Sequence, residues 1–448
     1  MTEPEQTPTV PEAVERIRAR NGDVHAFVRT RLDEALAEHA ARAAEPARSP
    51  LHALPYGLKD TWDTAGIVTT AGSWRYRDRV PERSAPVHEV FDAAGAVLLG
   101  KTNCSDLALA PESDSYVGGT TANPHDPARS AGGSSGGAAA SVALGMSAFD
   151  WGSDIGGSIR LPAAYCGVLG LRLSSETWPM EGEFPAPPPS LRWMNGQGPL
   201  TPTLERMRAV LRVAAPRLRT GPARPFRARG AMIYAPDSGT AGRWASFEAD
   251  VTPALQKAFG EVRADHGLPS MRRARNIAAA LWASHMEDFL ACDVLTLREG
   301  ITAVLSALVF RGRFGDRRFH PRTAEVLLLI ALGRVTFYRD RAAARRASDE
   351  YRAAVDALWD QGWLLVAPTC TYPAPRHGGS VFNFNTTACT MPGNVADATA
   401  LALPFGTFPG GMPRSLQIMG PPGSEDAVID AGERVLAAAA AAGANGVH

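Results

Sequence analysis

Two spacings of apolar residues alternate along the first half of the chain. Segments with apolar residues three or four positions apart, typical of amphipathic helices, occupy residues 11–20, 26–44 and 87–94. Short apolar runs typical of strands recur at residues 53–58, 96–99, 147–150, 168–173 and 231–234. Strands that alternate with helices in this way predict an α/β fold whose sheet carries helices on both faces.

The second half of the chain is mostly helical in its spacing before it returns to strands. Residues 281–308 are apolar on several faces, and residues 321–356 predict one longer helix with arginine-rich turns. Strand-like runs return at residues 362–369, 400–405 and 415–419. An amphipathic helix is predicted at residues 425–442.

The length of 448 residues exceeds that of a usual single domain. No Pro/Gly/Ser linker or charged block divides the chain, so we predict one unit over residues 1–448. Within it we expect a disordered tail at residues 1–10 and a helical elaboration at about 201–360. The assembly that we expect is a homodimer.

Charge and cysteine content exclude several classes of partner. The 46 basic and 46 acidic residues balance, which argues against nucleic acid or an acidic membrane surface as a partner. No apolar run approaches 18 residues and the N-terminus lacks an apolar signal region, so we expect no membrane span and a cytoplasmic protein. The five cysteines follow no metal-ligand spacing, so we expect buried thiols, no metal and no cofactor.

Two Gly/Ser-rich loops, at residues 132–137 and 153–158, flank a small-residue run at 138–146 that predicts a short helix. Glycine lets the backbone approach a ligand closely, and successive N–H groups in such a loop can converge on one anionic atom. Gly/Ser runs also occur as flexible linkers, but apolar segments flank both loops closely here. The pattern therefore favours an oxyanion or phosphate site edged by serine hydroxyls.

Lysine is rare in this chain, where only three of the 46 basic residues are lysines. Lys59 and Lys101 each follow a strand-like run, and Lys257 lies in the helical part. An arginine keeps its proton in proteins, whereas a desolvated lysine can lose it and act as a base. Lys59 is therefore a candidate base for a serine, while Lys101 fits a structural donor to a loop carbonyl.

Five motifs occur in order along the chain: GLKD (57–60), TTAGS (69–73), GKTN (100–103), GGSSGG (132–137) and SDIGGSIRLPAAYCGVLGL (153–171). Together, and at these spacings, they resemble the amidase signature family of serine hydrolases. The resemblance covers residues 24–436 and is poor between 174 and 361. It implies the amidase signature fold, an α/β fold with a large mixed central β-sheet covered by helices on both faces. It also implies that the mid-chain helical elaboration caps the substrate cleft.

The resemblance implies a Ser-Ser-Lys triad. Ser158 would be the nucleophile, Ser134 would relay its proton, and neutral Lys59 would accept it. Lys59 can be neutral only if it is buried away from carboxylates, so Asp60 must point elsewhere. In the family the serine that corresponds to Ser134 follows a cis peptide bond. The oxyanion hole would consist of the N–H groups of Ile155, Gly156, Gly157 and Ser158.

Other positions carry a functional and a structural interpretation side by side. Ser135 and Asp154 would orient the two loops, or act as ordinary loop caps. The substrate contacts that we predict are Gly133, Trp282 and Phe310, although the two aromatic residues also fit a packed core. The chain departs from the family at Arg172, where lysine is usual, and in the loop after it. These departures bear on subgroup and substrate and leave the triad intact.

We expect an amidohydrolase that cleaves the C–N bond of a small linear amide through a Ser158 acyl-enzyme and releases ammonia or an amine. An apolar cap favours an aryl or alkyl acyl group. The alternatives are an amidase-like subunit of an amidotransferase, an amide-forming acyltransferase, or a scaffold without activity. Residues 132–136 also fit the G-x-S-x-G elbow of α/β-hydrolases, but the preceding NPHDPARSA is not a strand.

Overall fold

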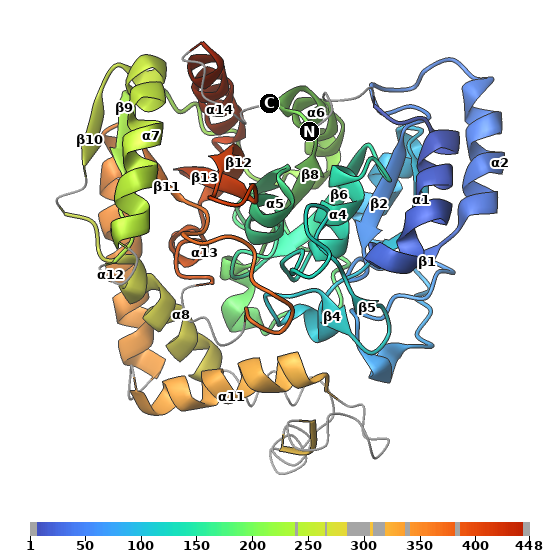
Figure 1. The fold of residues 1–448 in the computed structure, drawn as a ribbon, viewed down its shortest axis with the longest axis horizontal. Coiled ribbons are helices and arrows are strands. Elements are labelled where there is room, and N and C mark those ends of the chain that lie inside the picture. The colour runs from blue at the N-terminus through green and yellow to red at the C-terminus, as the bar shows by residue number, and fades with distance from the viewer. Residues whose placement is uncertain are drawn as a thin grey trace.

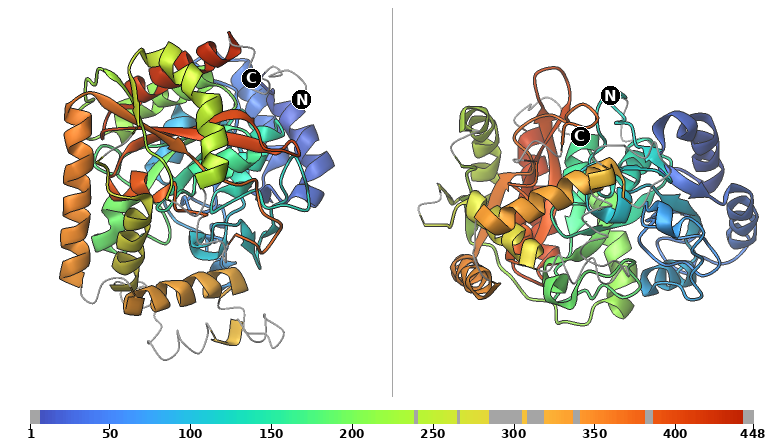
Figure 2. Two further views of the ribbon diagram at one scale, coloured as in Figure 1. Left: turned by 60° about the vertical axis from the view of Figure 1, so that its left-hand side comes forward. Right: turned by 90° about the horizontal axis from the view of Figure 1, so that it is seen from below.

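The computed structural model describes residues 7–237, 241–264, 267–284, 305–307, 319–336, 341–380 and 386–441. Eleven strands of this part of the chain form one central sheet in the order β1-β3-β2-β6-β8-β7-β12-β13-β11-β9-β10 (Figures 1 and 2). The strands are β1 Phe27–Thr30, β2 Pro55–Lys59, β3 Val97–Thr102, β6 Phe149–Asp154, β7 Leu169–Arg172, β8 Gly196–Thr201, β9 Gly230–Ile233, β10 Val262–Ala264, β11 Trp363–Pro368, β12 Thr399–Thr407 and β13 Pro413–Gly420.

The sheet is mixed, as predicted. Strand β2 runs parallel to β3 and β6, and β9 runs parallel to β10 and β11. The pairs through β8, β7, β12 and β13 are antiparallel, as is the edge pair of β1 and β3. A separate two-stranded sheet pairs β4 Asp114–Ser115 with β5 Gly119–Thr120.

Helices cover both faces of the sheet (Figure 2). They are α1 Val10–Val24, α2 Leu32–Ala43, α3 Pro86–Ala93, α4 Gly136–Ala143, α5 Arg160–Cys166, α6 Leu204–Leu218, α7 Ala241–Phe259, α8 Met271–Ser284, α11 Pro321–Thr336, α12 Arg341–Asp360, α13 Met391–Val395 and α14 Glu425–Ala440. Three short 3₁₀ turns are η1 Trp74–Tyr76, η2 Asp106–Ala108 and η3 Pro189–Met194.

Alternate strand residues serve the two layers, because successive side chains of a strand point to opposite faces. Leu364 and Val366 of β11 belong to the core formed with α3, α6, α7 and α14. Leu365, between them, packs into the core of α8, α12 and α13. A third core joins α1, α4 and α5 to the strands that lie nearer β1. Helices α4 and α5, which carry the two Gly/Ser-rich loops at their N-termini, thus lie on the sheet itself.

Three sequence predictions of local structure need correction. Residues 26–44 are not one helix, because Phe27 begins an edge strand that pairs with β3 before α2 starts. Residues 321–356 hold two helices, α11 and α12. The tail predicted at residues 1–10 is too long: Thr9 caps α1 reciprocally with Glu12, and Val10 is fully buried. Residues 1–6 lie outside the described residues, as does most of the segment 281–308.

Candidate active site

Lys59 is the last residue of β2 and is fully buried. Its Nζ lies 2.8 Å from Ser134 Oγ and 2.9 Å from Ser153 Oγ. Burial lowers the pKa of Lys59, and the more distant acidic groups Asp150, Asp154 and Glu183 only partly oppose this effect. The buried amine is therefore held against a serine hydroxyl and is biased toward its neutral form.

The neighbouring carboxylate of Asp60 turns away from Lys59, as the neutral lysine requires. Asp60 Oδ2 accepts hydrogen bonds from the backbone N–H and the hydroxyl of Thr70. Lys101 is also buried and donates to the Trp62 carbonyl and, at 3.1 Å, to Thr64 Oγ1. Lys101 thus has the structural role that the sequence predicted, and the two buried lysines serve different loops.

Ser134 lies in the loop that leads into α4 and is buried. The Gly133–Ser134 peptide bond is cis, as the resemblance implied. Ser113 Oγ donates to the Ser134 carbonyl at 3.0 Å and accepts from Gly136 N at 2.7 Å, and these two bonds fix the loop. Ser135 N donates to the Ser158 carbonyl at 3.1 Å, so the two Gly/Ser-rich loops are tied to each other.

Asp154 organises the second loop, which carries Ser158 into α5. It forms a fully buried ion pair with Arg160, whose Nε and Nη2 each lie 3.0 Å from a carboxylate oxygen. Asn394 Nδ2 donates at 2.9 Å to the same carboxylate. Burial alone would raise the pKa of Asp154, but Arg160, Arg172 and Asn394 hold it far below the usual value. Asp154 is therefore an ionised anchor for this loop.

The expectation for the oxyanion hole needs one correction. The Gly157 N–H donates at 2.7 Å to Asp154 Oδ1, so it is committed to the anchor and is not a free donor to substrate. Gly157 itself has φ of +116°, and a Cβ there would come within 2.3 Å of Thr390 Oγ1, so only glycine fits. Ile155, Gly156 and Ser158 are the predicted donors whose N–H groups the Asp154 anchor does not use.

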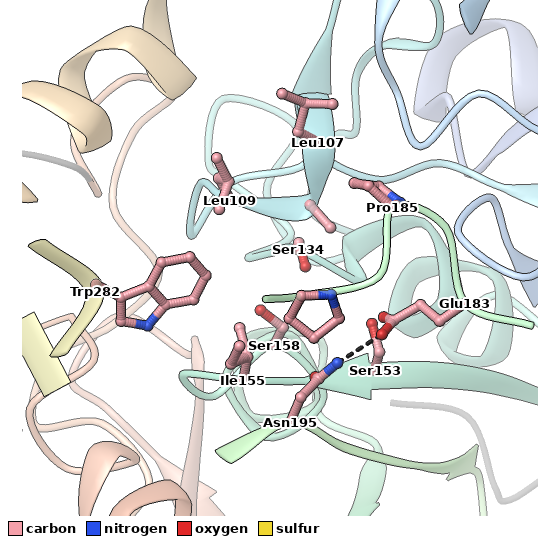
Figure 3. Close-up of a pocket in the computed structure, with 12 residues that line it drawn as sticks. Leu107, Leu109, Ser134, Ser153, Ile155, Ser158, Glu183, Pro185, Asn195 and Trp282 are labelled. Atoms are coloured by element: carbon pink, nitrogen blue, oxygen red, sulfur yellow. Dashed lines mark hydrogen bonds between the residues drawn. The ribbon is translucent and has the colours of Figure 1, made fainter. Parts of the chain in front are cut away.

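A pocket lies where the two loops meet (Figure 3), with about 370 Å³ of empty space that includes the opening to solvent. Both serine hydroxyls, Ser134 and Ser158, point into it. Trp282 of α8 forms part of the opposite wall. The remaining lining residues are Leu107, Ala108, Leu109, Ser153, Ile155, Glu183, Pro185, Pro187 and Asn195.

The other two predicted substrate contacts, Gly133 and Phe310, stand differently. Gly133 is packed against the backbone of Glu112, where a Cβ would lie 2.6 Å from Glu112 N, and it is not part of the pocket wall. The close approach of the two backbones explains why glycine is needed there. Phe310 lies outside the described residues.

The sequence prediction missed the polar residues on one side of the pocket. Glu183 lies in the stretch where the family resemblance is poor, and Asn195 Nδ2 donates to its Oε2 at 2.6 Å. Ser153 was seen only as part of a motif, although its Oγ contacts Lys59. The only sequence signal for this side of the pocket was that Ser153 lies in the same motif as Ser158. Glu183 and Asn195 gave no signal, because the path of their loop decides their contacts.

The described part of the chain contains no cluster of three or more His, Cys, Asp or Glu side chains that could hold a metal ion. Four cysteines, Cys104, Cys166, Cys370 and Cys389, are buried free thiols there. Among the same residues no helix is both long and apolar enough to cross a bilayer.

Comparison with known proteins shows which family the chain belongs to. The sequence model of the Amidase family matches residues 9–429. The chain is 30% identical over 455 residues to the 1-carboxybiuret hydrolase subunit of Pseudomonas sp. (strain ADP), with 94% of this chain and 93% of that protein covered. It is 32% identical over 451 residues to a glutamyl-tRNA(Gln) amidotransferase subunit of Chloroflexus aurantiacus, with 93% and 90% covered.

A solved structure agrees with the sequence matches. The peptide amidase of Stenotrophomonas maltophilia superposes with a TM-score of 0.72 at 25% identity, with 95% of this chain and 92% of that chain covered. Together with the motifs, the family match over most of the chain and the shared mixed sheet, this likeness assigns the protein: it is a member of the amidase family, the amidase signature hydrolases.

Proposed function

We propose that the protein is a serine amidohydrolase that cleaves the C–N bond of a small linear amide through an acyl-enzyme on Ser158. The observation that carries the proposal is the buried hydrogen bond of 2.8 Å between Lys59 Nζ and Ser134 Oγ, next to a pocket that Ser158 also lines. A serine hydroxyl is a weak nucleophile and needs such a base nearby. A lysine whose pKa burial lowers can supply it near neutral pH.

In the proposed reaction Ser158 Oγ attacks the amide carbonyl carbon. Its proton passes to Ser134 Oγ as the proton of Ser134 passes to Lys59 Nζ. The carbonyl oxygen gains negative charge, which backbone N–H groups of the 155–158 loop stabilise. Collapse of the intermediate breaks the C–N bond, and the leaving nitrogen takes the proton back along the same route. A water molecule, deprotonated by the same relay, then hydrolyses the ester.

The experiment that tests the nucleophile and the base uses a fluorophosphonate probe together with ammonia release from simple aryl and alkyl amides. The wild type should be labelled on Ser158, and Ser158→Ala should lose both labelling and turnover. Lys59→Arg should lose about 10²- to 10⁴-fold in rate, the usual contribution of a general base, because arginine cannot accept the proton. Labelling on Ser134 alone, or an active Lys59→Arg, would contradict these roles.

A second candidate is an amidase-like subunit that works with a partner, or an acyltransferase that passes the acyl group to an amine. This candidate is supported by the similarity of the chain to two proteins that are themselves subunits, of a glutamyl-tRNA(Gln) amidotransferase and of a hydrolase. The purified chain alone distinguishes the two: release of ammonia without a partner supports the amidohydrolase. Activity that appears only with an added amine acceptor or partner chain supports the alternative.

The walls of the pocket support an apolar acyl group as the substrate side chain. Leu107 and Leu109 lie on one side and Trp282 on another, and Pro185 also lines the pocket (Figure 3). Ligand pockets of this kind are mostly apolar with a few placed polar groups. We therefore propose aryl or alkyl amides as the substrate class.

A further inference from the structure

Glu183 lies on the pocket wall close to the proposed catalytic groups, although no motif includes it (Figure 3). Its carboxylate accepts a hydrogen bond of 2.6 Å from Asn195 Nδ2 and lies beside the Ser153 hydroxyl (Figure 3). Ser153 Oγ in turn accepts from Lys59 Nζ at 2.9 Å. Glu183, Ser153, Lys59 and Ser134 thus follow one another from the pocket wall to the proposed base and its serine.

The donors and acceptors along this chain are consistent. Ser153 has one hydroxyl proton, and because its oxygen receives an N–H of Lys59, that proton is left for the neighbouring carboxylate of Glu183. A neutral Lys59 then keeps its lone pair for the hydroxyl proton of Ser134, 2.8 Å away. The contact with Ser153 thus orients the amine so that its basic side faces Ser134.

The other acidic groups that act on Lys59 in the described residues are committed elsewhere. Asp154 is paired with Arg160. Asp150 is buried, which raises its pKa well above the usual value, and it accepts from Thr102 and from its neighbour's backbone N–H. Burial also raises the pKa of the Cys104 thiol. Burial raises the pKa of Glu183 as well, but Ser153, Lys59 and Asn195 oppose this effect. Glu183 is the acid that lies beside the hydroxyl that Lys59 contacts.

Contacts with neighbouring residues fix the loop that carries Glu183, and this fixes the position of the Glu183 carboxylate in the pocket wall. Phe184 N donates to the Thr61 carbonyl at 2.7 Å, close to Lys59 in the sequence. The guanidinium of Arg79 stacks 3.7 Å from the centre of the Phe184 ring. Asp63 holds that guanidinium through two bonds, of 2.6 and 2.8 Å.

We propose that Glu183 is a positioning residue for the reaction: through Ser153 it holds the Lys59 amine against Ser134 and stabilises the positive charge that Lys59 gains when it accepts the proton. The inference rests on the proposed function. In the reaction Lys59 takes the Ser134 proton while Ser134 takes that of Ser158, and the carboxylate of Glu183, one hydroxyl away, balances the charge that Lys59 gains. Glu183 thus stabilises the positive charge of Lys59 during the reaction. Since it does not contact the amine directly, it does not keep Lys59 protonated before the reaction.

The test uses Glu183→Gln, which keeps the shape and one acceptor oxygen and removes the charge. Glu181→Gln, an exposed glutamate two residues away, is the matched control. The chain has only three lysines, so ¹³Cε-lysine NMR gives three signals, and Lys59→Arg assigns the one of interest. The pH titration of Lys59 and the pH dependence of fluorophosphonate labelling at Ser158 are measured in parallel.

Because a nearby carboxylate favours the charged form of lysine, Glu183→Gln should move the Lys59 midpoint to lower pH by roughly one unit. The rising limb of the labelling profile should move with it. A weaker base should also lower the plateau by up to about tenfold, so the two profiles should cross. The Lys101 signal and the Glu181→Gln profile should stay where they are. Loss of a merely structural contact would lower the rate at every pH without moving the midpoint.

A Lys59 midpoint in Glu183→Gln equal to the wild-type value would overturn the inference and leave the proposed function standing. Normal labelling of Lys59→Arg would instead remove the proposed base, and the proposed function with it. Should Glu183→Gln melt below the assay temperature, Glu183→Asp replaces it, since aspartate withdraws the carboxylate from Ser153. An unchanged Lys59 midpoint in that variant would overturn the inference as well.

Discussion

Asp154→Asn should separate the anchor of the Ser158 loop from the chemistry that the loop carries. The Asp154 carboxylate accepts the two side-chain bonds of Arg160 and one from Asn394. It also accepts the backbone N–H groups of Gly157 and Ile159, at 2.7 and 3.1 Å. Asparagine keeps the shape but loses the charge, and its NH₂ group then faces donors. The buried guanidinium of Arg160 is left without a counterion.

The magnitude follows from the complete burial of both partners of this ion pair. Removal of one partner of a buried ion pair costs about 3–5 kcal/mol of unfolding free energy. With an unfolding entropy of about 2.1 cal/mol/K per residue, 448 residues give about 0.9 kcal/mol/K, so the melting temperature should fall by about 3–5 °C. The released loop should misplace its oxyanion donors, which costs about 10²- to 10³-fold in kcat for each donor lost.

The assay compares melting by calorimetry with the rate of fluorophosphonate labelling at 25 °C, well below melting. Asp397→Asn is the buried control: Asp397 pairs with Arg172, so a similar loss of stability should come with a smaller loss of rate. Asp33→Asn is the surface control, since the Arg18–Asp33 pair is 54% and 88% exposed and should contribute little. A wild-type labelling rate in Asp154→Asn would refute the view that this carboxylate holds the loop.

Two further predictions concern stability and substrate. Because burial lowers the pKa of Lys59, a protonated Lys59 destabilises the folded state. The whole penalty applies at pH values below the folded pKa and fades as pH rises toward the ordinary pKa of lysine. Lys59→Met should therefore raise the melting temperature most at low pH, and the gain should shrink as pH rises. For primary amides from acetamide to octanamide, kcat/KM should rise by roughly fourfold per carbon until the pocket is full, and Trp282→Ala should flatten this series. A flat wild-type series would contradict the apolar acyl pocket.

The parts of the fold and site that could be predicted from the sequence are those that local motifs carry. The strand before Lys59 and the two Gly/Ser-rich loops depend on residues close together in the chain, so their pattern showed them. Strand β1 was missed because Phe27–Thr30 continues the apolar spacing of the following helix, although Phe, Val and Thr favour strands and pair here with β3. The Gly157 donor was misjudged for a related reason: a motif shows that N–H groups converge, but the loop's path decides that this one meets Asp154.

The departures from the family pattern at Arg172 and in the loop after it are connected in space, which the sequence alone did not reveal. Arg172, where lysine is usual, donates at 2.6 Å to the Ala398 carbonyl, at 3.0 Å to the Met194 carbonyl and at 2.9 Å to Asp397. A planar guanidinium can serve these separate acceptors at once, which a compact ammonium cannot. Since Met194 directly precedes Asn195, Arg172 fixes the residue that donates to Glu183. The arginine and the divergent loop therefore form one support that delivers a carboxylate to the pocket, and a relative with lysine at this position would have to hold its loop differently.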